Sequence, residues 1–224
     1  MNLARTTCLL VLIAAVATGA ETPKGGKTKP AVAGAVARGQ TLDLVGVFDA
    51  KHAVRGTWRV TGNELHAADG ETPARLVLPV APGDVYSLKV EFTRTEDEGL
   101  VGFVLPVGNR QCLLALNVKG TANGLELVDG RGAAENATTV AAALAPGRRV
   151  SLEISVRVEG KEASITTTLD DRPFVFYRGP TASLGLPKDY VLPQKNALGL
   201  IATPGTVFHK LRFRAASAGA RKLD

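Results

Sequence analysis

Three acidic residues are the candidates for acid–base chemistry in this chain: Glu91, Glu126 and Asp129. A retaining glycosidase needs two carboxyl groups about 5 to 5.5 Å apart, and one strand supplies them from positions i and i+2 or i+4, which share a face. Glu126 and Asp129 are three positions apart, so a regular strand sends them to opposite faces. Glu126 would have to pair with Glu91 from another strand, and solvated carboxylates that balance Lys89 and Arg110 are the simpler interpretation. The spacing therefore favours a non-catalytic protein.

Other side chains that bind metals or act as nucleophiles give weaker signals. His52, His66 and His209 lack a short zinc spacing, and His209, inside an alternating apolar run, is predicted to be a hydrogen-bonded face or core residue. The acidic run at residues 96–98 offers oxygen ligands to Ca²⁺, although a charged loop at a strand edge is the simpler interpretation. Cys112 alternates with leucines and is predicted to be a buried hydrophobe. We expect no cofactor and no resident metal.

Period-two alternation of apolar and polar residues predicts the strands that must position these groups. In the clearest run, alternate residues from Val150 to Val158 are apolar, and the pattern resumes after Glu159-Gly160 as far as Leu169, which predicts a hairpin. Such strands recur along most of the chain, separated by Gly, Pro, Asp and Asn, with almost no helical period. About a dozen strands exceed one flat sheet, so we predict an all-β fold of two packed antiparallel sheets.

The ends of the chain differ from this body. Residues 1–20 combine one positive charge, a short apolar run and small residues before position 21, which predicts a cleaved secretory signal peptide. The apolar run is shorter than the roughly 20 residues of a membrane span. We expect a flexible basic linker at 21–39, a sandwich domain at 40–214 and a disordered tail at 215–224. The protein is thus expected to be secreted, periplasmic or on the cell surface, with no membrane span.

The charge balance argues against nucleic acid as a partner. The chain has 27 Lys and Arg and 21 Asp and Glu, a formal net charge of +6. Residues 42–214 hold 20 basic and 19 acidic side chains, and 20 minus 19 leaves a body with a net charge of only +1. Basic residues are not interleaved with aromatic ones, as they are in nucleic-acid-binding surfaces.

A series of turn and core residues resembles, in order, a known family. The residues that fit are Trp58, Gly62, Leu65, Glu91, Phe92, Gly124, Glu126, Asp129, Asp171, Pro173, Tyr177, Gly179, Gly199, Leu200, Val207, Phe208 and Arg212. They resemble the concanavalin A-like (laminin G-like) jelly-roll domains of bacterial secreted proteins and, more narrowly, the 3-keto-disaccharide hydrolase-like domains. The resemblance covers nearly all of residues 42–214 and implies a two-sheet antiparallel jelly-roll sandwich.

Two departures weaken the enzymatic implication of this resemblance. The family's Asn-Ser-Gly followed by an arginine is replaced by residues 97–103, and its Trp-Asn before the long strand by residues 148–150. Both changes remove groups that a sugar pocket would use. We therefore expect an exported, non-catalytic domain that recognises a carbohydrate or a surface protein, through residues that the resemblance and the charges suggest: Glu91, Arg110, Glu126, Asp129 and Tyr177.

Two alternatives remain open at this stage. The first is a glycoside-acting hydrolase of the 3-keto-disaccharide hydrolase type, for which the resemblance implies Glu91, Glu126 and Asp129 as the acids. The second is a structural domain of a surface assembly. An enzyme should bring at least two carboxylates into one pocket, a lectin should show aromatic and amide groups there, and a scaffold should show neither.

Overall fold

The alternating segments form two antiparallel sheets in a computed structural model that describes residues 34–68, 70, 72–97 and 99–223. The predicted signal peptide and residues 21–33 of the predicted linker lie outside the described residues. Within the described part, the only helical segments are the short 3₁₀ turns η1 (Ala50–His52), η2 (Thr181–Ser183) and η3 (Lys188–Tyr190). No helix in these ranges is long and apolar enough to span a membrane.

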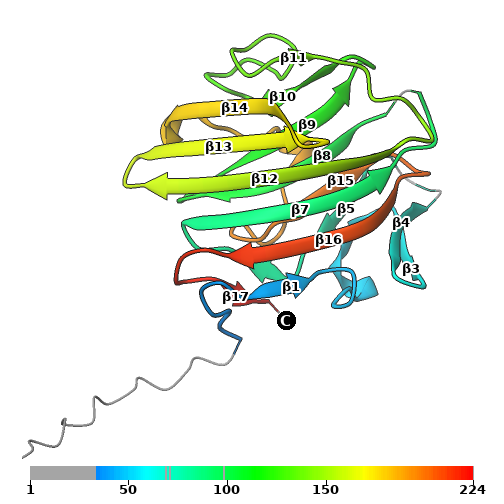
Figure 1. The fold of residues 1–224 in the computed structure, drawn as a ribbon, viewed down its shortest axis with the longest axis horizontal. Helices are drawn as coiled ribbons and strands as arrows, with labels where there is room; N and C mark the ends of the chain where they lie inside the picture. Colours follow the sequence, from blue (N-terminus) through cyan, green and yellow to red (C-terminus); the bar gives the residue numbers. More distant parts are fainter. Residues whose placement is uncertain (1–33, 69, 71, 98, 224) are drawn as a thin grey trace, which may run out of the picture. The chain divides into compact units, whose positions relative to one another are not determined.

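The first sheet has eight strands and lies in front in Figure 1. Its order is β14 (Arg172–Pro180), β13 (Glu162–Leu169), β12 (Arg149–Glu159), β7 (Val85–Thr93), β16 (Val207–Ala215), β4 (Glu64–Ala68) and β3 (Thr57–Thr61), and β1 (Thr41–Asp43) also pairs with β16. The predicted hairpin is β12 and β13, which pair from Leu152↔Leu169 to Glu159↔Glu162. The neighbours β12, β7 and β16 come from distant parts of the chain.

The second sheet has seven strands and lies behind the first in Figure 1. Its order is β11 (Val140–Ala141), β10 (Ala122–Glu126), β9 (Arg110–Val118), β8 (Val101–Val107), β15 (Gly199–Ala202), β5 (Ala74–Val77) and β2 (Ala53–Arg55). A separate short pair joins β6 (Val80–Ala81) to β17 (Arg221–Lys222). The two large sheets confirm the predicted all-β, antiparallel jelly-roll sandwich.

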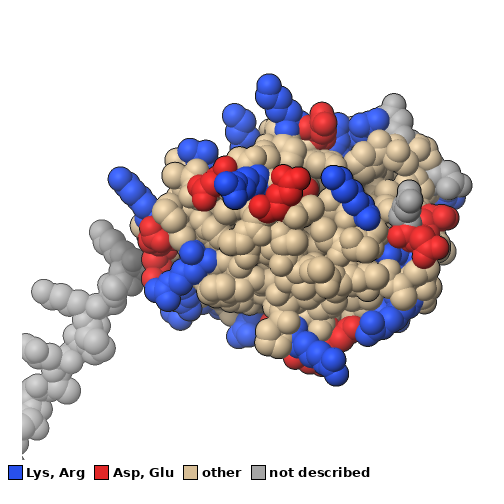
Figure 2. Space-filling view, turned by 90° about the horizontal axis from the view of Figure 1, so that it is seen from above, with Lys and Arg blue, Asp and Glu red and all other residues tan. Residues whose placement is uncertain are grey.

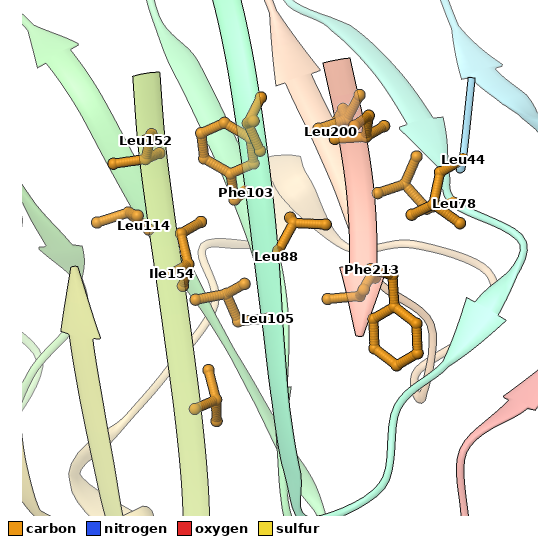
Figure 3. Close-up of a cluster of buried hydrophobic side chains, with 14 of the residues drawn as sticks. Leu44, Leu78, Leu88, Phe103, Leu105, Leu114, Leu152, Ile154, Leu200 and Phe213 are labelled. Atoms are coloured by element: carbon orange, nitrogen blue, oxygen red, sulfur yellow. The ribbon is translucent and has the colours of Figure 1, made fainter. Parts of the chain in front are cut away.

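The core lies between the two large sheets (Figure 3). Leu152 and Ile154 of β12 are fully buried and share one hydrophobic cluster with Phe103 of β8 and Leu114 of β9. Each buried side chain of this size contributes roughly 1.5 to 3 kcal/mol. The alternation in the sequence therefore predicted the inner face of β12 correctly.

Three other side chains are buried in the core, and two of them, Trp58 and Cys112, were predicted to be there. Trp58 is buried in the core, and its ring centroid lies 6.2 Å from that of Phe208. Tyr86 is buried, and its hydroxyl donates a hydrogen bond to the carbonyl oxygen of Pro106 at 2.8 Å. Cys112 is fully buried, and this burial raises the pKa of its thiol to about 12. A thiol with so high a pKa is a hydrophobe and not a nucleophile.

The chain termini of the described part differ from the expected linker and disordered tail. Residues 215–223 contact the sandwich: β17 pairs with β6, and the amide of Val36 donates a hydrogen bond to the carbonyl oxygen of Ala220 at 2.9 Å. The amide of Lys222 in turn donates to Gly34 at 2.7 Å. Composition predicted disorder because these segments carry few apolar side chains, but backbone pairing between distant segments requires none.

Charges of both signs are interspersed on the face seen from above the molecule. Figure 2 shows acidic and basic side chains around a broad uncharged area. No single-sign field of the kind that attracts nucleic acid covers this face.

Candidate functional site

The outer face of the eight-stranded sheet carries a row of aligned polar residues. Strand register places Phe176 of β14 opposite Thr166 of β13, Thr166 opposite Ser155 of β12, Ser155 opposite Ser87 of β7, and Ser87 opposite Arg214 of β16. Cross-strand partners on one face lie about 4.5 to 5.5 Å apart. Three hydroxyl-bearing residues thus lie between an aromatic residue at one end and a guanidinium at the other.

The surface above this row is hollowed. A hollow of about 610 Å³ lies over β7, β12, β13 and β16, and the segment before β1 closes one side. Its polar and charged lining residues are Arg38, Ser87, Glu153, Ser155, Arg157, Ser164, Thr166 and Arg214. The hollow has the size of a small-molecule or oligosaccharide site.

A second hollow continues the first towards β14. Its volume is about 420 Å³, and it shares Arg157 and Ser164 with the larger hollow. Phe176 and Arg178 line it from β14, and the side chain of Phe176 is 59% exposed. We call the two hollows together the groove. An exposed aromatic ring beside a groove can stack on an apolar face of a ligand.

The groove is built on paired strands and one anchored turn. In the turn before β1, the amide of Gly39 donates a hydrogen bond to the carbonyl oxygen of Ala215 at 2.7 Å. The amide of Ala215 donates a hydrogen bond to the carbonyl oxygen of Gln40 at 3.2 Å. These bonds hold Arg38 beside the end of β16 that carries Arg214. On the other side, the Thr167 hydroxyl accepts from the amide of Val175 at 2.8 Å and fastens β13 to β14. Sites on such elements keep their geometry better than sites on free loops.

Glu91 lies on the same outer face but belongs to an ion cluster. Its carboxylate accepts hydrogen bonds from Arg149 Nη2 at 2.7 Å, from Arg149 Nε at 3.1 Å and from Lys210 Nζ. The hydrogen bond from Lys210, followed by that from Arg149, lowers the pKa of Glu91 below its ordinary value. The carboxylate is therefore balanced by Arg149 and Lys210, and not by Lys89 and Arg110 as expected from the sequence.

His209 joins three strands in a chain of hydrogen bonds on this face. Its Nε2 is 2.8 Å from the hydroxyl of Thr93 on β7, and its Nδ1 is 2.6 Å from Oε1 of Glu64 on β4. The bond to His209 is the main cause that lowers the pKa of Glu64. This arrangement confirms the prediction that His209 is a hydrogen-bonded face residue.

Glu126 and Asp129 lie on the other sheet. Glu126 ends β10, and its Oε2 accepts from the amide of Ala133 at 3.2 Å. It lines a separate hollow of about 500 Å³ with Tyr190 and Asn117. Asp129 is exposed in the following loop. Packed sheets are about 10 Å apart, and the carboxylates of Glu91 and Glu126 both point outward from different sheets. The two carboxylates therefore lie on opposite faces of the sandwich. They do not form the pair that the hydrolase alternative needs.

The other two sequence-predicted site residues are also apart from the groove row. Tyr177 is only 7% exposed, and its hydroxyl donates to the carbonyl oxygen of Pro180 at 2.7 Å. The alternation of β14 turns Tyr177 towards the core with Val175, away from the groove. Arg110 begins β9 of the second sheet and is exposed.

The acidic run at residues 96–98 was considered above as a source of oxygen ligands for Ca²⁺. Glu98 lies outside the described residues, and the carbonyl oxygen of Asp97 accepts hydrogen bonds from Arg94 at 3.5 Å and from Asn117 at 3.1 Å. Across the described ranges, no three His, Cys, Asp or Glu side chains are grouped so as to hold a metal ion.

Sequence reasoning missed Phe176, Ser155, Thr166 and Arg214 as site residues. Each stands at an outward position of an alternating strand, so the period-two pattern already marked them as solvent-facing. That signal does not distinguish a groove from an ordinary polar surface, because the groove depends on which strands are neighbours.

Comparison with solved structures places the fold. The chain is similar to a Bacillus subtilis protein of unknown function with a galectin-like fold, with 11% identity, a TM-score of 0.53, and 82% of this chain and 96% of that chain covered. Other similar structures are a galectin of Caenorhabditis elegans (14% identity, 69% and 99% covered, TM-score 0.41) and lectin I-B4 of Griffonia simplicifolia (11% identity, 80% and 99% covered, TM-score 0.48). No protein-family model and no curated protein matches the sequence. The fold is a galectin-like jelly-roll sandwich.

Proposed function

We propose that this protein is an exported, non-catalytic domain that binds an oligosaccharide in the groove on the outer face of its eight-stranded sheet. The observation that carries the proposal is the floor of hydroxyl groups from Ser87, Ser155 and Thr166, with the exposed ring of Phe176 at its end. Sugars present hydroxyl groups that exchange hydrogen bonds with such side chains, and apolar ring faces that stack on aromatic rings. Jelly-roll sandwiches host many functions, so the groove supports this role and the fold alone does not.

The groove also supports recognition in preference to glycoside hydrolysis. Its larger hollow contains one carboxylate, Glu153, whereas glycoside hydrolysis normally uses two. The smaller hollow adds Glu159 and Glu162, which are exposed at the turn between β12 and β13, and Glu159 forms an ion pair with Arg157. Of the three acids expected for a hydrolase, Glu91 and Glu126 lie on opposite outer faces and Asp129 lies in a loop. A structural role in a surface assembly would not explain the hollow or the exposed ring of Phe176.

A glycan array with residues 21–224 tests the proposal and identifies the ligands. We expect binding of oligosaccharides, followed by loss of that binding in Phe176→Ala and in Ser155→Trp, whose indole would fill the larger hollow. Val60→Ala is the matched control, because Val60 is an exposed apolar residue on β3 of the same sheet outside the groove. Thermal melts verify folding of each variant. Glycan binding that survives both groove substitutions would refute this location, and an array without any bound glycan would refute the function.

Export is a separate part of the proposal. Sequencing the N-terminus of protein recovered outside the cytoplasm should find a chain that begins near Glu21. A full-length chain retained in the cytoplasm would contradict export.

A further inference from the structure

The larger hollow of the groove has an excess of positive charge. Arg38, Arg157 and Arg214 line it, against the single carboxylate of Glu153, which leaves three minus one, or two, positive charges. Glu153 is itself the cross-strand partner of Lys89. The smaller hollow adds Arg178 but also Glu159 and Glu162, so the positive excess is confined to the larger hollow.

These arginines are not engaged in strong ion pairs. The side chains of Arg38 and Arg214 make no hydrogen bond or ion pair with any described residue. The side chain of Arg157, which is 60% exposed, contacts only Glu159, at 3.4 Å. Elsewhere on the same face, Arg149 pairs with Glu91 at 2.7 Å, and Arg148 pairs with Asp170. The guanidinium groups of Arg38 and Arg214, at one end of the groove, therefore lack a carboxylate partner among the described residues.

The charged end and the aromatic end are far apart. Arg214 lies on β16 and Phe176 on β14, with β7, β12 and β13 between them. Four strand spacings of about 4.8 Å separate the two residues by about 19 Å. The register row joins these ends through the hydroxyl groups of Ser87, Ser155 and Thr166. A ligand that uses both ends must be an extended molecule.

We propose that the groove selects acidic oligosaccharides. An anionic substituent of the sugar, a carboxylate or a sulfate, binds Arg38 and Arg214, and a sugar ring further along the ligand stacks on Phe176. The inference deepens the proposed function and depends on it. Guanidinium groups bind such oxyanions through paired, charge-assisted hydrogen bonds.

An acidic peptide fits the same charges less well. Extended peptides gain affinity by pairing their backbone with the free edge of a sheet. Between Phe176 and Arg214 the groove crosses β13, β12 and β7, which each pair with a neighbour on both sides, and only β14 at the Phe176 end is an edge strand. The backbone groups of β13, β12 and β7 are consumed by the ladder, so only side chains recognise a ligand there, and the row supplies hydroxyl groups.

Calorimetric titrations with defined probes test the proposal. The probes are oligogalacturonates as dimer, tetramer and hexamer, the same hexamer after reduction of its carboxyl groups, a sulfated hexasaccharide derived from heparin, and poly-glutamate. We expect the acidic hexamer or the sulfated one to bind at least about tenfold more tightly than the carboxyl-reduced hexamer, and the dimer to bind more weakly than the hexamer. The preference should decrease as salt rises, because the arginines are exposed. The better of the two acidic hexamers identifies the anionic group.

Variants separate this inference from the proposed function. Arg38→Ala with Arg214→Ala should lower affinity for the acidic hexamer by about tenfold or more and should lower affinity for the carboxyl-reduced hexamer by a much smaller factor. Arg131→Ala is the matched control, an exposed arginine in the loop after β10 of the other sheet. If the wild-type protein bound the acidic and the carboxyl-reduced hexamers equally well, and Phe176→Ala lost both, the acidic selectivity would be overturned. The proposed function would still stand. Poly-glutamate that binds as tightly as the best hexamer would overturn the carbohydrate assignment.

Discussion

Phe176 and Tyr177 are adjacent on β14 and face opposite sides of the eight-stranded sheet. The ring of Tyr177 is buried in the core and its hydroxyl donates to Pro180, whereas Phe176 is 59% exposed beside the groove. The pleat of the strand separates a structural aromatic residue from one that is available to a ligand.

This pair gives the first prediction. Tyr177→Ala should destabilise the protein by about 3 to 5 kcal/mol, because it empties a large buried position. Phe176→Ala should change the free energy of unfolding by no more than about 0.5 kcal/mol and should weaken glycan binding. Chemical denaturation and calorimetric titration measure the two effects, and a stable Tyr177→Ala variant that has lost glycan binding would reverse the two roles.

A second pair on β12 tests the orientation of the long strand. Ile154→Ala should cost about 2 to 5 kcal/mol, since Ile154 is fully buried between the sheets. Ser155→Ala, one residue further along the chain and on the outer face, should cost no more than about 0.5 kcal/mol. Equal losses of stability in denaturant titrations would mean that this strand does not separate core from surface.

The Glu91 cluster predicts a loss of stability in acid. The pKa of Glu91 is lower in the folded protein than its ordinary value of 4.5, so its ion pairs stabilise the fold above that value. This stabilisation is lost as the pH falls below 4.5 through the folded-state pKa. Unfolding measured from pH 7 to pH 3 should therefore show a smaller decline for Glu91→Gln than for wild type. Identical declines would show that the cluster does not contribute.

Catalysis by the three sequence-predicted acids gives a fourth prediction. Glu91 and Glu126 lie on opposite outer faces, so we expect no appreciable hydrolysis of glucosides or 3-keto-glucosides by the wild-type protein. Chromatography of the products after prolonged incubation checks this expectation, with Glu126→Gln as the comparison. Turnover by wild type that Glu126→Gln abolishes would establish a hydrolase centred on the seven-stranded sheet.

The ordered C-terminus gives a fifth prediction. Removing residues 217–224 deletes the pairing of β17 with β6 and the buried Ala220, so thermal unfolding should occur at a lower temperature than in the full chain. Calorimetry measures the shift. An unchanged transition would restore the original expectation of a disordered tail.

The sequence by itself determined the fold class and the facing of individual strands. Alternation from Val150 to Leu169 predicted the β12–β13 hairpin, and it separated Ile154 from Ser155, because a period of two is a local property of the chain. The buried positions of Trp58 and Cys112 followed from similar local patterns.

Tertiary structure alone decided where the groove lies. Ser87, Ser155 and Arg214 are far apart in the chain, and they form one row only because β12, β7 and β16 are neighbours in the sheet. Non-local pairing also sent Glu91 and Glu126 to opposite outer faces and ordered the C-terminal segment. Alternation states which residues point out of a sheet, but strand order depends on how two whole sheets bury their apolar faces against each other.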